Sequence, residues 1–292
     1  MRTGQDGSIT NMNEGELVLS RGVVWPLHAI ERLLGKRKAT VVVYHSINEP
    51  PDRYTVSPSS FARQVRFLRD HFTIVRLRDI PAALRGLNDQ KVAITFDDAL
   101  ADFKQNAYRV LRELQVPATV FVPTGLIGRT NEWDSSAGRP TLPIMTGDQM
   151  QELAQDGLID FGSHSVTHSD FGKLSEPQMR WEAEESKQAL EKLLDIPITM
   201  FAYPYGGYGV FSRRATWILR DAGYDLAVTT VWGTRQSPQN LLTLRRIDFN
   251  DSDTDEEIRS KIAGDYDWRS LRAGAGYVLR TIKQIALARR TE

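Results

Sequence analysis

The sequence lacks cysteine, net charge and long apolar runs. Without cysteine, neither a disulfide nor a thiolate ligand is available, so any bound metal must be held by nitrogen and oxygen atoms. Lysine plus arginine and aspartate plus glutamate both total 37, so no overall positive field attracts a nucleic-acid backbone. No apolar run approaches the roughly 20 residues that cross a bilayer. These absences argue against a nucleic-acid partner and against a membrane-spanning helix.

The first 20 residues also lack the pattern of a secretory signal. They are polar and carry Asp6, Glu14 and Glu16, whereas such a signal has a basic start followed by an apolar core. We therefore expect a cytoplasmic protein that is not exported by this route. At the other end, residues 271–290 alternate apolar and basic side chains in a helical pattern. This segment predicts either a docking helix with a solvated basic face or a peripheral contact with the anionic inner face of a membrane.

Strand-like apolar runs alternate with segments of helical periodicity over most of the chain. The predicted strands are 40–45, 92–96, 118–122, 159–162, 199–203, 225–230 and 243–249. Ser57 before Pro58 predicts the start of one helix, and Ser175 with Gln178 predicts a capping box at the start of another. Regular alternation of strand and helix favours an α/β fold with a parallel sheet, and about seven such units favour a barrel over an open sheet.

Two adjacent carboxylates, Asp97 and Asp98, follow the predicted strand 92–96. The carboxyl end of parallel strands is where α/β barrels hold their reacting groups. Carboxylates this close resist joint ionisation unless a cation relieves them, which favours one as a metal ligand and the other as a base. A structural alternative is that Asp97 or Asp98 caps a helix predicted from Ala99 to Gln115.

Two of the five histidines, His164 and His168, lie four residues apart after the predicted strand 159–162. Catalytic zinc sites typically combine about three protein ligands with an open position, and two histidines with one carboxylate would complete such a set. A pair of histidines on a surface helix can have the same spacing. Because no glutamate follows His164, the metalloprotease pattern His-Glu-x-x-His is excluded. The base and the third ligand must then come from elsewhere, and Asp97 and Asp98 fill both roles.

Three motifs, in this order and spacing, resemble the polysaccharide deacetylase family, also called carbohydrate esterase family 4 or the NodB homology domain. They are Thr95-Phe96-Asp97-Asp98-Ala99, His164-Ser165-x-x-His168 and Phe201-Ala202-Tyr203-Pro204-Tyr205-Gly206. The resemblance covers about residues 39–250 and implies a distorted (β/α)7-type barrel of parallel strands. It leaves residues 1–38 as a flexible N-terminus with a short helix over 23–34, and 251–292 as a C-terminal helical extension.

The resemblance also implies a reaction, the metal-dependent removal of N-acetyl or O-acetyl groups from sugars. By position, Asp97 would be the general base and the Tyr205 backbone N–H an oxyanion donor. The implied metal ligands are Asp98, His164 and His168. Zinc is the expected ion, and cobalt, nickel or manganese are alternatives because such a ligand set accepts several first-row ions.

Two positions depart from the family pattern. Leu244-Arg245-Arg246 stands where a late Leu-x-His motif usually supplies a histidine, and Ala202 replaces the arginine that usually orients the base. His45, which ends the predicted strand 40–45, resembles the acid of a permuted subgroup of exopolysaccharide N-deacetylases. We therefore predict His45 as the general acid, with a buried structural histidine as the alternative. Arg246 is the predicted replacement for the base-orienting arginine.

The predicted substrate depends on aromatic residues and on the chemistry of the site. Candidate sugar contacts are Tyr203, Tyr205, Tyr208, Trp232 and, in the long segment 125–146, Trp133, although core packing is the commoner role of such residues. We expect a carbohydrate N-deacetylase whose partner is an N-acetylhexosamine unit of a glycan or glycolipid. The alternatives are a deformylase or ring-opening amidohydrolase on the same barrel, and a non-catalytic carbohydrate-binding protein.

Overall fold

The structure is a computed structural model that describes residues 39–85, 90–270, 273–274 and 276–277. The chain divides into two units, residues 1–36 and 37–292, and all the described residues belong to the second. The helix predicted over 23–34 and most of the basic segment 271–290 lie outside the described residues. No described helix is both long and apolar enough to cross a membrane. The predicted domain limits and the membrane contact stay predictions.

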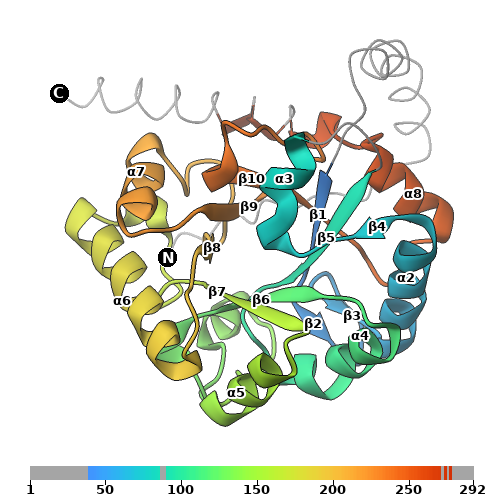
Figure 1. Ribbon diagram of the computed structural model, residues 1–292, viewed down its shortest axis with the longest axis horizontal. Coiled ribbons are helices and arrows are strands. Elements are labelled where there is room, and N and C mark those ends of the chain that lie inside the picture. Colours follow the sequence, from blue (N-terminus) through green and yellow to red (C-terminus); the bar gives the residue numbers. More distant parts are fainter. Residues whose placement is uncertain (1–38, 86–89, 271–272, 275, 278–292) are drawn as a thin grey trace. The chain divides into compact units, whose positions relative to one another are not determined.

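Seven parallel strands close into a barrel (Figure 1). They are β1 Ala39–Tyr44, β5 Lys91–Phe96, β6 Ala118–Val122, β7 Ile159–Ser163, β8 Met200–Ala202, β9 Leu226–Trp232 and β10 Leu244–Asp248. Their order is β1-β10-β9-β8-β7-β6-β5, and β5 pairs back with β1 to complete the ring. The predicted parallel α/β barrel is confirmed, with strand limits that differ from the prediction by at most two residues.

Three two-residue strands were not predicted. The strand β4 (Thr73–Ile74) pairs with the start of β5, while β2 (Ser46–Ile47) pairs with β3 (Thr55–Val56) in a separate small sheet. Segments this short carry too few residues to show a period in the sequence.

The barrel strands are buried on both faces, which explains why they appear in the sequence as continuous apolar runs. Alternate residues, among them Val41, Ala93 and Val228, point into the barrel and form a core of their own. Leu77, which begins the 3-10 helix Leu77–Asp79, and Ile80, which begins α3 (Ile80–Arg85), pack into this inner core next to residues from the beginnings of the strands. The N-terminal end of the barrel is therefore filled, and the opposite end remains for polar groups.

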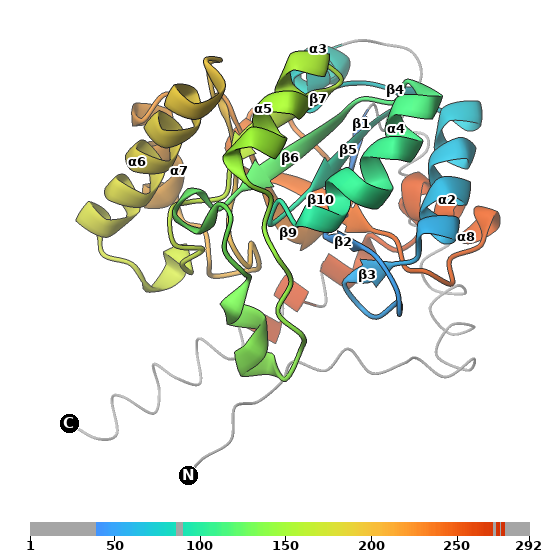
Figure 2. The ribbon, with the colours of Figure 1, turned by 90° about the horizontal axis from the view of Figure 1, so that it is seen from below.

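Helices cover the outside of the barrel (Figures 1 and 2). They are α2 Pro58–His71, α4 Tyr108–Leu114, α5 Gly147–Asp156, α6 Glu176–Leu194, α7 Arg213–Asp221 and α8 Asp255–Ala263. Both predicted helix starts are confirmed. The Ser57 hydroxyl accepts from the Ser60 N–H of α2, and the Gln178 side chain accepts from the Ser175 N–H at 2.9 Å in the capping box of α6.

The segment after β5 differs from the helix predicted over Ala99 to Gln115. Asp98 and Ala99 have left-handed φ values of 68° and 51°, and a π-helical stretch, Phe103–Ala107, precedes α4. The helical turns therefore begin after both carboxylates, and the capping role considered for them is wrong. The left-handed turn carries Asp98 away from the helix and leaves both side chains for the site.

Candidate metal centre and its base

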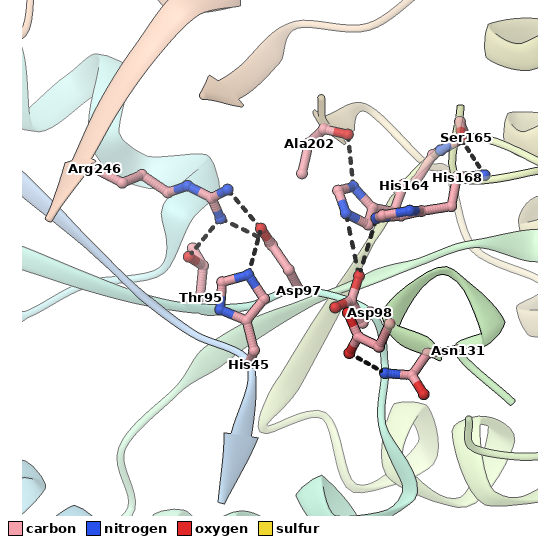
Figure 3. A network of polar contacts seen from close by, with 12 residues as sticks. His45, Thr95, Asp97, Asp98, Asn131, His164, Ser165, His168, Ala202 and Arg246 are labelled. Atoms are coloured by element: carbon pink, nitrogen blue, oxygen red, sulfur yellow. Dashed lines mark hydrogen bonds and ion pairs between the residues drawn. The ribbon is translucent and has the colours of Figure 1, made fainter. Parts of the chain in front are cut away.

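The Asp97 carboxylate is gripped by the Arg246 guanidinium (Figure 3). Arg246 Nη1 donates to Asp97 Oδ1 at 2.7 Å and Nη2 donates to Oδ2 at 2.6 Å, a two-pronged pairing that fixes the carboxylate plane. Arg246 is itself held by Nε–H donation to the Thr229 carbonyl at 2.8 Å and by the Thr95 hydroxyl at 3.2 Å. Both members of the pair are buried. The structure therefore places Arg246 where an orienting group for Asp97 must lie.

Strand alternation explains how Arg246 reaches Asp97. Leu244 and Ala93 line the inner core of the barrel, so Arg246 and Asp97, two and four residues further on, also lie on the inward side. Ala202, at the position where the family usually has arginine, belongs to the same inner core and is fully buried. The guanidinium that contacts Asp97 therefore comes from β10 and not from the strand end at Ala202, and the orienting role of Arg246 stays a prediction.

Asp98, His164 and His168 converge on one point. One ligand atom from each lies within 4.8 Å of the others, and Asp98 Oδ1 is 3.5 Å from His164 Nε2 and 3.3 Å from His168 Nε2. All three residues are buried, and Asp98 Oδ1 accepts no well-formed hydrogen bond from the described residues. A buried carboxylate oxygen that faces two imidazoles suits a divalent cation, and two nitrogens with one oxygen suit zinc, cobalt or nickel.

The charges of the site keep both carboxylates ionised. Burial raises the pKa of Asp97, but the Arg246 charge and nearby histidines outweigh it and hold the pKa below its usual value. Burial also raises the pKa of Asp98, yet His164 and His168 lower it well below the usual value. For His168, burial dominates and lowers the pKa, which favours the neutral imidazole that a metal needs.

His45 lies beside Asp97, on the side away from His164 and His168 (Figure 3). Its Nε2 is 4.0 Å from Asp97 Oδ2, and its side chain is 25% exposed. The Tyr54 ring, from the segment before β3, packs edge-on against the imidazole at 5.5 Å. His45 is therefore not the buried structural histidine considered as the alternative. It stands beside the base and within reach of solvent, where a proton donor would be useful.

The loop that carries the histidines is shaped by Ser165, which belongs to the second motif, and by Glu182, which no motif includes. Ser165 and His168 have left-handed φ values of 66° and 58°, and the Ser165 Oγ accepts from the His168 N–H at 3.0 Å. Glu182 of α6 accepts from the N–H groups of Val166 at 2.7 Å and Thr167 at 3.0 Å. Glu182 is buried on the inner face of α6, and a glutamate at an otherwise apolar helical position is the signal that could have found it.

Tyr205 lies at the mouth of the site. Its backbone has a φ of 61°, and no hydrogen bond between described residues uses its N–H, which leaves the amide available to an oxyanion. The residue is 52% exposed, and its ring lies 4.9 Å from the His168 ring. Both residues line a cavity of about 490 Å³ that extends from the site over Asp170, Lys173 and Leu174.

The other aromatic candidates have different surroundings. Tyr203 is fully buried and donates to the Leu242 carbonyl at 3.2 Å, so its prediction as a sugar contact is wrong. Trp232 packs under the cations of Lys261 and Arg269. Trp133 comes from the segment between β6 and α5 and stacks on the His168 ring, with centroids 3.9 Å apart.

Comparison with known proteins agrees with this geometry. Residues 85–227 match the family model described as polysaccharide deacetylase. The provisionally named polysaccharide deacetylase YxkH of Bacillus subtilis is 29% identical over 215 residues, which cover 72% of this chain and 71% of that protein. A Staphylococcus aureus poly-β-1,6-N-acetyl-D-glucosamine N-deacetylase is 27% identical over 178 residues, and the match spans 56% of this chain and 58% of that enzyme.

A solved structure shows the same fold. The Streptococcus pyogenes deacetylase PplD, in complex with acetate, superposes with a TM-score of 0.66 and 28% identity, and the match covers 77% of this chain and 98% of PplD. The likeness includes the closed barrel of parallel strands with flanking helices. The family model and these relatives are deacetylases, and the staphylococcal relative is an N-deacetylase, an enzyme that hydrolyses an amide bond.

Proposed function

Since the chain carries a polysaccharide deacetylase domain, we propose that it is a metal-dependent carbohydrate N-deacetylase. Its substrate would be the acetamide of an N-acetylhexosamine unit in a glycan or glycolipid. One observation carries the proposal: a buried carboxylate, Asp97, is clamped by Arg246 directly beside a triad of Asp98, His164 and His168. A base beside a metal centre is a combination that hydrolyses unactivated amides.

Asp98, His164 and His168 are the residues that would hold the ion. A divalent cation bound there would polarise the acetyl carbonyl and lower the pKa of attacking water. The chain's own groups supply the remaining steps. Asp97 accepts the proton of the water, and Arg246 keeps that carboxylate ionised and in one orientation. The Tyr205 N–H donates to the oxygen that becomes negative, and His45 protonates the departing amine.

The position of His45 supports its role as acid. Its Nε2 is 4.0 Å from Asp97 Oδ2, so the base and the acid flank the place where the amide would react. Glycans are favoured as substrates because the cavity beside Tyr205 extends the site. The staphylococcal relative makes β-1,6-linked N-acetylglucosamine oligomers the first substrates to test.

The test is acetate release from such oligomers by purified protein that has been stripped with a chelator and reloaded with zinc, cobalt or nickel. We expect no acetate after stripping and restored release after metal addition. Asp97→Asn should lower turnover by about 10²–10⁴-fold while zinc still binds, because only the base is lost. Asp98→Asn and His168→Ala should lose zinc binding as well.

Different products separate this proposal from its alternatives. Formate instead of acetate, from N-formylated sugars, would favour a deformylase. Sugar binding with no released acid from any metal form would favour a carbohydrate-binding protein. Full activity of Asp97→Asn would remove the proposed mechanism.

A further inference from the structure

The two histidines of the metal centre are oriented by different means. His164 Nδ1 lies 2.8 Å from the Ala202 carbonyl, and this hydrogen bond fixes its ring and leaves Nε2 for the ion, as in most metal sites. Among the described residues, no hydrogen-bond partner reaches His168 Nδ1, although the residue is only 7% exposed. A flat aromatic surface lies against that ring instead. The Trp133 and His168 rings are stacked, with centroids 3.9 Å and planes 18° apart.

Trp133 belongs to a segment that bridges the two ligand loops. The segment leaves the end of β6, forms the 3-10 helix Glu132–Ala137 and returns to α5. On its way out, the Gly125 N–H donates to the Val166 carbonyl at 2.9 Å, within the histidine loop. On its return, the Met145 N–H donates to the Ala99 carbonyl at 2.9 Å, directly after Asp98. In Figure 2 the segment, drawn in green, extends beyond the barrel before it returns to α5.

The segment that carries Trp133 is held close to both ligand loops. A Cβ at Gly125 would lie 2.9 Å from the Val166 carbonyl oxygen, so only glycine permits this approach. Asn131, which is buried, donates from its side chain to Asp134 Oδ2 at 2.6 Å, and its backbone N–H donates to the Leu142 carbonyl at 3.0 Å. Trp133 lies between the two bonded residues Asn131 and Asp134. These bonds hold the backbone on either side of Trp133 independently of His168.

We propose that Trp133 is a positioning residue for His168, with its indole face in the role that the Ala202 carbonyl has for His164. The stack restricts rotation of the imidazole and keeps Nε2 directed at Asp98 Oδ1, 3.3 Å away. Without the stack, the ring must be ordered when the ion binds, so metal affinity falls. This inference rests on the metal centre of the proposed function, and its test measures metal binding instead of hydrolysis.

The experiment is a zinc titration of the metal-free full chain by calorimetry, with three variants of one residue. Trp133→Ala removes the indole, Trp133→Leu keeps apolar volume without a flat face, and Trp133→Phe keeps a smaller aromatic face. We expect the first two to weaken zinc binding by about 10-fold, at the lower end of the effect of losing a ligand's supporting group, and Phe to stay within about 3-fold of wild type. Activity is not needed for this measurement.

Controls separate positioning from general damage. Trp181→Ala removes a tryptophan that is 48% exposed on α6, and it should leave zinc affinity unchanged. Proton NMR of the metal-free chain provides a readout that a loss of stability would not mimic. The indole ring current should shift the His168 ring protons upfield in wild type, less so in Trp133→Phe, and not in Trp133→Leu, while the His164 signals stay in place.

Two outcomes overturn the inference in distinguishable ways. If Trp133→Leu and Trp133→Ala are folded and bind zinc as tightly as Trp181→Ala, Trp133 does not position His168 and the metal centre stands. If wild type binds zinc no better than His168→Ala, the metal centre itself fails, and the proposed function fails with it. Should Trp133→Ala not fold, the zinc affinities of Trp133→Leu and Trp133→Phe and the His168 proton shifts of the wild type decide whether Trp133 positions His168.

Discussion

The base half and the ligand half of the site are built from different kinds of backbone. Asp97 and His45 lie at inward positions directly after β5 and β1, and Arg246 lies at an inward position within β10, so strand alternation gives each side chain its direction. Asp98 and His168 lie instead in turns with left-handed φ values of 68° and 58°. Such turns are costly for residues other than glycine and persist only when their surroundings hold them.

The two halves are consequently stabilised by different forces. In the base half a buried ion pair is satisfied almost entirely by its own members and by Thr229 and Thr95. In the ligand half, backbone N–H groups are tied down by Ser165 and Glu182. Mutations should therefore act through charge in the first half and through backbone conformation in the second.

The largest effect is expected where the buried charge is left alone. Arg246→Leu removes the only guanidinium that touches Asp97 among the described residues. We expect the free energy of unfolding to fall by about 3–5 kcal/mol, because an uncompensated carboxylate remains in the barrel. The pKa of Asp97 should rise for the same reason, and acetate release at neutral pH should be lost. Urea unfolding and the acetate assay measure the two effects.

A double variant shows whether charge is the cause. Adding Asp97→Asn to Arg246→Leu removes the unpaired carboxylate and should recover a large part of the lost stability. Arg245→Leu is the control, because Arg245 is on the same strand but its side chain points to the face opposite that of Arg246. It should lower the free energy of unfolding by about 1 kcal/mol or less. If the double variant were no more stable than Arg246→Leu, packing and not charge would explain the loss.

The base half could be predicted from the sequence to a greater extent than the ligand half. Strand alternation and the position of Asp97 after β5 are visible in the sequence, so the barrel and the base could be predicted, and Arg246 followed from a vacancy at Ala202. The orientation of His168 could not, because it depends on a left-handed turn, on Glu182 from a distant helix and on Trp133 from a long segment between strands. Such contacts between segments leave no local period, and only the buried position of Glu182 in the pattern of α6 hints at one of them.

Another buried carboxylate, Asp102, shows how burial changes the pKa where no described cationic side chain pairs with the carboxylate. Its Oδ2 accepts from the Ser46 hydroxyl at 2.5 Å, and burial raises its pKa to about 6. Because the folded state prefers the protonated acid, this residue favours folding most below pH 4. That contribution is lost as the pH rises from about 4 to about 6, so at pH 8 its charge costs about 3 kcal/mol.

Asp102→Asn should therefore stabilise the protein. At pH 8 we expect a gain of up to about 3 kcal/mol in the free energy of unfolding, and near pH 4 almost none. Urea unfolding at pH 4, 6 and 8 checks the difference. Asp225→Asn, at an exposed position, is the matched control for the substitution itself and should change the free energy of unfolding little. A gain for Asp102→Asn that is equal at all three pH values would contradict the titration argument.

His45 belongs to the base half, and its removal should affect turnover without affecting folding or metal binding. Because its side chain is 25% exposed and carries no buried partner charge beyond Asp97, His45→Ala should fold normally and bind zinc with wild-type affinity. Turnover should drop by about 10²-fold, the usual effect of losing a general acid. His71→Ala, exposed on α2, is the control. Undiminished turnover of His45→Ala would take His45 out of the mechanism and leave the base half without a proton donor.

The smallest effect is expected in the ligand half, at Ser165, where two opposing terms can be separated. Ser165→Ala removes the acceptor of the His168 N–H but keeps a Cβ at a φ of 66°, so stability should fall by about 1 kcal/mol. Ser165→Gly removes the same acceptor but relieves the left-handed backbone, which is worth roughly 1–2 kcal/mol, so its stability should lie at or above that of Ser165→Ala. Thermal unfolding of the two variants measures the difference. A glycine variant clearly less stable than the alanine variant would mean that this turn is not held against backbone strain, and the contrast between the two halves would reduce to the ion pair alone.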